Sequence, residues 1–82
     1  MGYHTKHIKK GVYGDISKIE EELEELKDAE QQSNKILSMV ELSDLIGAIK
    51  GFVQKKYPFV SMEDLLKMSE STRSAFIDGT RK

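Results

Sequence analysis

A long apolar stretch, residues 35–56, dominates this sequence. Its apolar side chains recur at helical spacing and surround most of the helix that they predict: Ile36, Leu37, Met39, Val40, Leu42, Leu45, Ile46, Ile49, Phe52 and Val53. Tyr57-Pro58 predicts the end of this helix, because proline disfavours the helical conformation in the residue before it. A chain of 82 residues buries a limited core by itself. We therefore expect this helix to be covered partly by its own chain and partly by a second one.

A second helix is predicted at about residues 16–32. Its apolar residues Ile16, Ile19, Leu23 and Leu26 follow the spacing of a narrow stripe, which supports one packed face. Ser17-Lys18-Ile19-Glu20 has the form of a capping box, in which the serine and glutamate side chains bind amides at the helix start. Ser33-Asn34 suits a turn, because asparagine tolerates the left-handed conformation. The two long helices should form an antiparallel hairpin over residues 16–56.

Two shorter helices are predicted over residues 61–78. Ser61 is the expected cap of the first, which reaches about Met68, and Ser69 is the expected cap of the second, which stops at Gly79. They should cover the ends of the hairpin, whereas residues 1–14 form an irregular basic arm. The fold is thus predicted as one all-α domain, residues 1–82, whose hairpin completes a four-helix bundle as a homodimer or homotetramer.

Gly47 and Gly51 lie four residues apart on one face of the long helix. They can be interpreted as a place where another backbone approaches closely, or as tolerated glycines without a role.

Composition excludes several classes of function. The chain has no cysteine, no apolar leader and no run near the roughly 18 apolar residues that cross a bilayer, which predicts a cytoplasmic protein of a bacterial cell or a phage-infected host and no membrane role. Its 13 basic and 14 acidic residues leave a formal net charge of −1. No overall field therefore favours a nucleic-acid polymer as partner.

Two acids interrupt the apolar stretch. Viewed down the axis of the predicted helix, successive residues are about 100° apart. With Glu41 set at 0°, Ala48 lies at about −20°, Leu45 at about +40° and Asp44 at about −60°. Both carboxylates thus fall within an apolar face, and burial of an unpaired carboxylate costs several kcal/mol. They require protonation, a basic partner or a metal ion.

The helix predicted at about residues 16–32 carries a similar arc of acids, formed by Glu21, Glu22 and Glu25. Taken alone, this arc is compatible with an ordinary solvated face. In an antiparallel hairpin, however, Glu22 and Glu25 can face Glu41 and Asp44. Four carboxylates make an all-oxygen site without histidine or cysteine, which favours Mg²⁺, with Mn²⁺ as a substitute, over zinc.

Together these acids resemble the signature of the MazG-type all-α nucleoside triphosphate pyrophosphohydrolases, in particular their compact phage and bacterial members. The signature is EExxE, a spacer and ExxD, and here it reads Glu21-Glu22-Leu23-Glu24-Glu25, fifteen residues and Glu41-Leu42-Ser43-Asp44. The resemblance implies Mg²⁺-dependent cleavage of a nucleoside triphosphate between its α and β phosphates. It implies that Glu22, Glu25, Glu41 and Asp44 bind metal and that Glu21 orients or deprotonates the attacking water.

An anionic substrate also needs positive donors, and the candidates are Lys9, Lys10, Lys35, Arg73 and Arg81. Each can equally be a solubilising surface residue. Larger family members carry basic and polar residues after ExxD, whereas Ile46–Gly51 is mostly apolar or small. This departure keeps two alternatives open: a catalytically weak or inactive oligomeric module that binds nucleotide or a host protein, and a plain helical dimer without metal.

His4 and His7 lie three residues apart in the basic arm. They can be interpreted as a metal-binding pair. The favoured interpretation is an arm that is disordered or contacts a base, because no structured ligand lies near them in the sequence.

Overall fold

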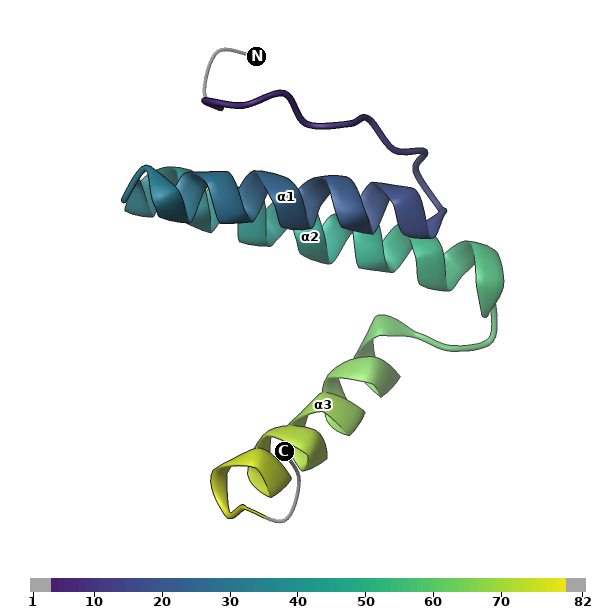
Figure 1. The fold of residues 1–82 in the computed structure, drawn as a ribbon. Helices are drawn as coiled ribbons and strands as arrows, with labels where there is room; N and C mark the ends of the chain where they lie inside the picture. Colours follow the sequence, from purple (N-terminus) through teal and green to yellow (C-terminus); the bar gives the residue numbers. More distant parts are fainter. Residues whose placement is uncertain (1–3, 80–82) are drawn as a thin grey trace.

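The computed structural model describes residues 4–79, and this part of the chain contains three helices and no strand. Helix α1 spans Ile16–Gln31, α2 spans Lys35–Lys56 and α3 spans Met62–Ile77. Helices α1 and α2 form an antiparallel hairpin, the N-terminal arm runs along it, and α3 projects away (Figure 1). The predicted all-α class is confirmed. None of the helices within residues 4–79 is long and apolar enough to cross a bilayer.

The turn between α1 and α2 falls where the sequence predicts it, but Ser33 and not Asn34 takes the left-handed conformation. Ser33 adopts the left-handed conformation with φ 55°, and Asn34 is the N-cap of α2. The Asn34 side-chain oxygen accepts a hydrogen bond of 3.0 Å from the amide of Leu37. Because a side-chain cap satisfies an otherwise unpaired amide, Asn34 stabilises the start of α2.

The capping box predicted at Ser17 is wrong. Helix α1 begins after Asp15, which is the N-cap residue but makes no side-chain cap. Its carboxylate instead accepts a 2.6 Å hydrogen bond from Lys55 of α2, and the Ser17 hydroxyl accepts one of 3.0 Å from the amide of Val12. Contacts with α2 and with the arm therefore replace the local cap.

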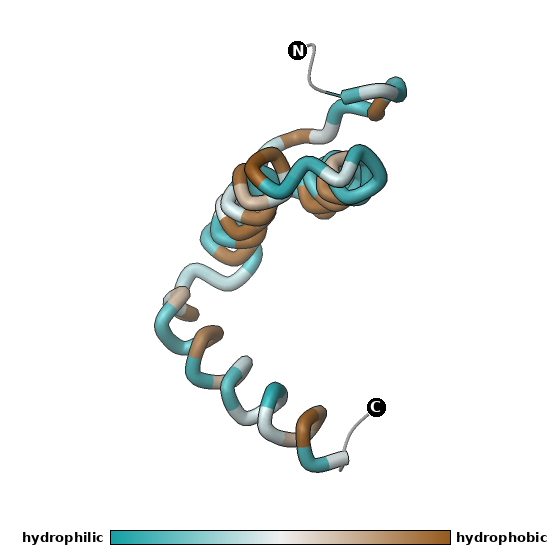
Figure 2. Tube along the Cα trace, turned by 90° about the vertical axis from the view of Figure 1, so that its left-hand side faces the viewer, coloured by the Kyte–Doolittle hydropathy of each residue, from teal (hydrophilic) through white to brown (hydrophobic). Residues whose placement is uncertain are grey.

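Helix α2 ends at Lys56, and Tyr57, the residue before Pro58, is its C-cap, as predicted. Ser61 then caps α3 by a reciprocal pair of 3.1 Å hydrogen bonds with Asp64. The prediction of two short helices is wrong, because α3 is continuous through Ser69, whose hydroxyl donates to the carbonyl of Leu66 within the same helix. No residue of α3 is buried. The expectation that this region covers the hairpin ends is also wrong, because α3 stands apart from the hairpin in two views (Figures 1 and 2).

The interface between α1 and α2 holds a small apolar core. The buried apolar residues among those described are Ala29, Leu37, Ala48 and Val53. The other buried residues of these two helices are Ser38, Gly51 and four acids, namely Glu21, Glu22, Asp28 and Glu41. Large apolar side chains remain exposed along both α2 and α3. Figure 2 marks the hydrophobic positions of these helices in brown. The hairpin therefore buries charge where an isolated helical pair would bury leucine and isoleucine.

The two glycines of α2 have different surroundings. A Cβ added at Gly51 would lie 2.5 Å from Cζ of Tyr13, whose ring covers this position from the arm. A Cβ added at Gly47 would meet no atom within 4 Å. Gly51 thus permits a close approach within its own chain, and Gly47 faces open space.

This difference predicts opposite effects of alanine. Gly47→Ala should raise the free energy of unfolding by about 0.5–1 kcal/mol, because alanine loses less backbone entropy in a helix. Gly51→Ala should lack that gain, because the Tyr13 ring must move. Urea denaturation of both variants beside the parent measures the difference. A loss of stability in Gly47→Ala would contradict the open surroundings of Gly47.

Candidate metal centre

The structure brings acids from α1 and α2 together at the middle of the hairpin. Glu22, Glu41 and Asp44 each offer a carboxylate oxygen, and these oxygens lie within 4.8 Å of one another. Glu21, Glu22 and Glu25 form a second group within the same distance. Glu22 belongs to both groups and so joins them into one centre. Its members are the residues that the sequence motif predicts, and their role as metal ligands stays a prediction.

Two of these carboxylates are buried, and each keeps one oxygen without a partner among the described residues. Glu22 and Glu41 are 5% and 4% exposed, and Oε1 of each is buried with no hydrogen-bond partner within residues 4–79. A buried carboxylate oxygen without a partner costs free energy that a bound ion can recover. Since oxygen ligands suit hard divalent ions, the donor set is compatible with Mg²⁺ or Mn²⁺.

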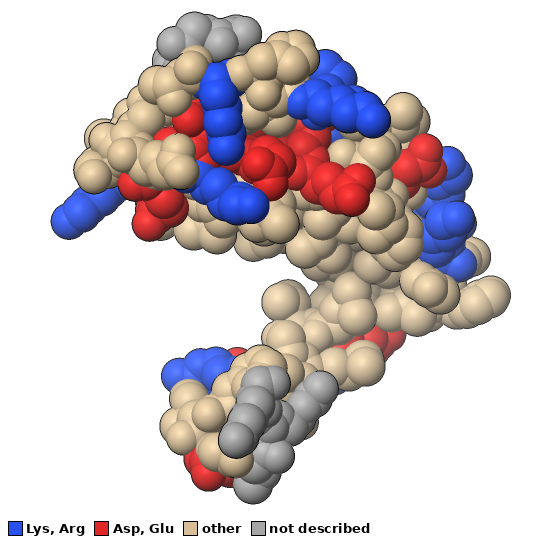
Figure 3. Space-filling model, in the orientation of Figure 1, with Lys and Arg blue, Asp and Glu red and all other residues tan. Residues whose placement is uncertain are grey.

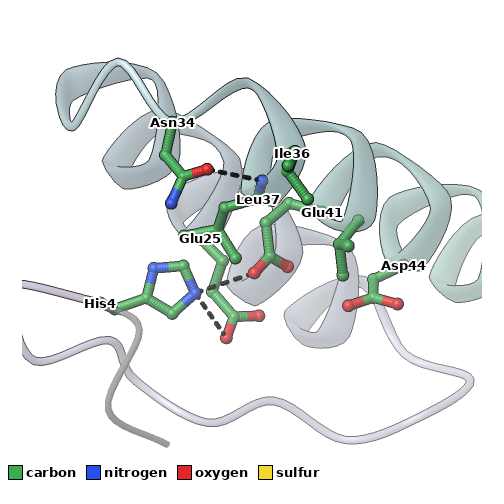
Figure 4. A pocket seen from close by; sticks show the side chains of 8 residues that line it. His4, Glu25, Asn34, Ile36, Leu37, Glu41 and Asp44 are labelled. Atoms are coloured by element: carbon green, nitrogen blue, oxygen red, sulfur yellow. Dashed lines mark hydrogen bonds and ion pairs between the residues drawn. The ribbon is translucent and has the colours of Figure 1, made fainter.

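A cavity of about 460 Å³ opens beside this centre. Carboxylates of Glu25, Glu41 and Asp44 line one part of it, and apolar side chains of α2 line another (Figure 4). The lining residues are His4, Glu25, Asn34, Ile36, Leu37, Val40, Glu41 and Asp44. A recess of this size, apolar with a few convergent polar groups, is typical of small-molecule sites.

The N-terminal arm contributes His4 to the centre. Its Nε2 lies 2.9 Å from Oε2 of Glu41 and 3.5 Å from Oε1 of Glu25, and its Nδ1 lies 2.9 Å from Oδ2 of Asp28. His7, by contrast, is exposed. The interpretation of a disordered arm is therefore wrong for His4, which contacts acids 21 to 37 residues away along the chain, whereas contact of the arm with a base stays a prediction.

Asp28 is a member of the site that the sequence analysis missed. It is fully buried and accepts hydrogen bonds from the Thr5 hydroxyl at 2.6 Å, the Thr5 amide at 2.9 Å and the Gln32 side chain at 3.0 Å, besides the contact with His4. The Thr5 hydroxyl and amide hold the pKa of Asp28 well below its usual range. Its position three residues after Glu25, on the same arc of α1, was the available signal.

The carboxylates of the centre differ in proton affinity. Burial, the hydrogen bond to Glu22 and the charges of Glu22, Glu41 and Glu21 raise the pKa of Glu25 to about 7. Burial also raises the pKa of Glu41, although His4 opposes the effect. In His4, burial lowers the pKa, but Asp28 and Glu41 outweigh it and the pKa lies above its ordinary value.

Glu21 has a different environment from the other acids. It accepts hydrogen bonds from the Gly11 amide at 2.8 Å and from Lys18 at 3.1 Å, and Lys10 lies 3.6 Å away. Burial raises its pKa, but these donors outweigh burial and the pKa lies below its ordinary value. A carboxylate held in this way is a weak proton acceptor, which favours orientation of water over its deprotonation.

The candidate phosphate-binding residues do not gather in one place. Lys10 lies beside Glu21, and with Lys9 it lines a smaller recess along α1. Lys35 is exposed at the start of α2, Arg73 lies on α3 and Arg81 lies outside the described residues. Basic side chains flank the acidic surface of the hairpin (Figure 3). Lys18, which the sequence analysis did not consider, lies 3.1 Å from both Glu21 and Glu22.

These pKa values predict how stability depends on pH without metal. Glu25 and Glu41 have folded pKa values above the ordinary 4.5, so the folded state binds more protons and loses stability as pH rises above that value. His4 acts in the same direction, since its raised pKa stabilises only while the ring is protonated. In EDTA, the free energy of unfolding should fall by about 1–3 kcal/mol between about pH 5 and about pH 8.

Urea denaturation across this range measures the effect, and Glu25→Gln should flatten the profile because it removes one titrating group. Glu20→Gln, an exposed neighbour on α1, is the matched control and should retain the parent profile. A rise in stability with pH over this range would contradict the raised pKa of Glu25.

Comparison with protein-family models, with curated proteins and with solved structures found no match to this chain.

Proposed function

We propose that this protein is a divalent-metal-dependent pyrophosphohydrolase of nucleoside triphosphates, of the MazG type. It cleaves an NTP or dNTP between the α and β phosphates to give a monophosphate and pyrophosphate. One observation carries the proposal: Glu22 of α1 and Glu41 of α2 approach each other with buried, unpartnered oxygens, beside Asp44. This is the pairing that the EExxE and ExxD motifs predict.

The chemistry can be assigned to the residues of the centre. Glu22, Glu25, Glu41 and Asp44 would hold the metal, which supplies charge neutralisation for the phosphates and activates water. In the proposed reaction, the oxygen of a water molecule would form a bond to the α phosphorus as the bond from phosphorus to the oxygen bridging the α and β phosphates breaks. Pyrophosphate leaves, and the water's proton passes to a carboxylate of the centre or to solvent. Glu21 orients the water.

The cavity offers a binding surface for the parts of the substrate that do not contact the metal. Its apolar wall, formed by Ile36, Leu37 and Val40, suits the face of a nucleobase, since planar rings bind well against apolar surfaces. The Lys10 side chain is 82% exposed, which leaves its ammonium group accessible to a phosphate.

The proposal includes a homodimer or homotetramer that acts in the cytoplasm of a bacterial cell or a phage-infected host, apart from membranes and nucleic-acid polymers. An apolar face of α2, formed by Ile36, Met39, Val40 and Ile46, is exposed in the single chain. Such a face costs free energy in water, and a second copy of the hairpin is apolar at the same positions. Paired hairpins complete a four-helix bundle.

A second candidate function is a metal-binding helical module without catalysis, which binds nucleotide or a host protein. The distribution of positive charge favours it. The two lysines nearest the acids, Lys10 and Lys18, both pair with Glu21, while Arg73 lies on the separate helix α3. An enzyme that neutralises a triphosphate usually has donors free for the substrate.

Product analysis distinguishes the two functions. With Mg²⁺ or Mn²⁺ and a panel of NTPs and dNTPs, the protein should release pyrophosphate and monophosphate in equal amounts. Glu41→Gln and Asp44→Asn should each lower kcat/KM by about 100-fold or more, because a ligand carboxylate is lost. Glu20→Gln, exposed on α1, is the control and should retain activity.

Unchanged turnover in the Glu41 and Asp44 variants would place the reaction elsewhere. Nucleotide binding by calorimetry together with no hydrolysis at either metal would favour the non-catalytic module.

The oligomer has its own test. Ile46 is 59% exposed on α2, and Ile46→Glu should reduce the mass in light scattering to that of one chain, because a charge enters the proposed interface. Leu66 of α3 has a similar exposure of 61%, and Leu66→Glu should leave the mass unchanged. A parent protein with the mass of a single chain would contradict the proposed bundle.

A further inference from the structure

The imidazole of His4 has the spacing of a metal ligand. His4, Glu25 and Glu41 each offer one ligand atom, and these atoms lie within 4.8 Å of one another. The Nε2 atom lies 2.9 Å from Glu41 Oε2 and 3.5 Å from Glu25 Oε1. Neighbouring ligands of an octahedral ion bound at about 2.1 Å lie about 3 Å apart. The three atoms are thus close to the arrangement that one ion requires.

Asp28 fixes the orientation of the His4 ring. Its buried carboxylate lies 2.9 Å from Nδ1 and is itself held by the Thr5 hydroxyl and amide and by Gln32. A carboxylate can only accept a hydrogen bond, so Nδ1 carries a proton and Nε2 points toward the acids. Metal-binding histidines usually donate their other ring nitrogen to a carboxylate in this way. Asp28 would be a positioning residue, because it acts through His4.

A buried oxygen of Glu41, beside the contact with His4, has no partner in the described part of the chain. Oε1 of Glu41 is buried without a partner within residues 4–79, while Oε2 of the same carboxylate faces His4 Nε2 (Figure 4). Without metal, a proton on Nε2 occupies the space between the ring and the acids. A divalent ion in that space would replace this proton and bind both the nitrogen and the carboxylate.

We propose that His4 is a metal ligand, that its Nε2 joins Glu25 and Glu41 in a mixed nitrogen and oxygen site, and that this site prefers a first-row transition ion such as Mn²⁺ to Mg²⁺. Imidazole nitrogen binds transition ions better than it binds Mg²⁺, whose ligands are almost always oxygens. The inference rests on the metal centre of the proposed function and changes its preferred ion. It also gives the N-terminal arm a role, since bound metal would tie the arm to the hairpin.

Calorimetry with the metals alone tests the preference. His4→Gln should lower Mn²⁺ affinity by about 10-fold to 100-fold and change Mg²⁺ affinity by less than about threefold. Asp28→Asn should lower Mn²⁺ affinity by about 10-fold, because the ring loses its orientation. His7→Gln is the matched control on the same arm, where the side chain is exposed, and should bind both metals like the parent.

A spectroscopic test distinguishes a ligand from a merely structural histidine. Proton NMR of the Co²⁺-loaded protein should show a strongly shifted, exchangeable resonance from the His4 Nδ1 proton, present in His7→Gln and absent in His4→Gln. The proposal is overturned if that resonance is missing from the parent, or if His4→Gln leaves the ratio of Mn²⁺ to Mg²⁺ affinity unchanged. Higher affinity of His4→Gln for both metals would also overturn it, since the imidazole would then compete with the ion.

The outcome is separable from that of the proposed function. Selective Mn²⁺ binding through His4, together with no release of pyrophosphate, would support the ligand and contradict the enzyme. Pyrophosphate release with Mg²⁺ that is unaffected by His4→Gln, together with an unchanged metal preference, would support the enzyme and contradict the ligand.

Discussion

The contact between α1 and α2 depends on how buried carboxylates are compensated. Four apolar residues, two of them the small Ala29 and Ala48, form the described core, and Glu22 and Glu41 lie in the same interface. Like charges at this separation repel strongly in a medium of low polarity. The interface is compatible with a stable hairpin because protons, basic side chains or a metal ion neutralise the acids. The stability of the hairpin and the proposed ion binding therefore depend on the same residues.

The arm is part of this compensation. His4 and Thr5 hold Asp28, the Gly11 amide holds Glu21, and Tyr13 covers Gly51. Residues 4–14 have no regular secondary structure, yet they supply several of the hydrogen-bond donors that the buried acids of α1 require. Backbone amides and imidazole serve well here, since they satisfy carboxylate oxygens without the long flexible stem of lysine. The arm thus completes the acid-rich side of the hairpin.

Local sequence patterns predict the hairpin well, but they predict its contacts with distant segments of the chain poorly. The bounds of α2 follow from apolar periodicity and from Pro58, and the convergence of Glu22 with Glu41 follows from their angular positions on two antiparallel helices. The prediction of a cap at Ser17 is wrong because α1 begins after Asp15, which pairs with Lys55, 40 residues away. The prediction for His4 is wrong for the same reason, since no local pattern specifies which acids a distant imidazole will contact. Asp28 differs, because its spacing from Glu25 was visible and only its significance was missed.

Helix α2 contributes residues to both the candidate metal centre and the face of the proposed oligomer. Ile36 and Val40 line the cavity, and they also belong to the exposed apolar face on which a second hairpin would pack. A second copy placed there would border the open side of the cavity and exclude water from it. Exclusion of water strengthens every electrostatic interaction between carboxylates, metal and phosphate. In the proposed enzyme, assembly and catalysis are then coupled through the same turn of α2. One chain supplies the acids, and its partner excludes water from the cavity, which gives these acids a surrounding of low polarity.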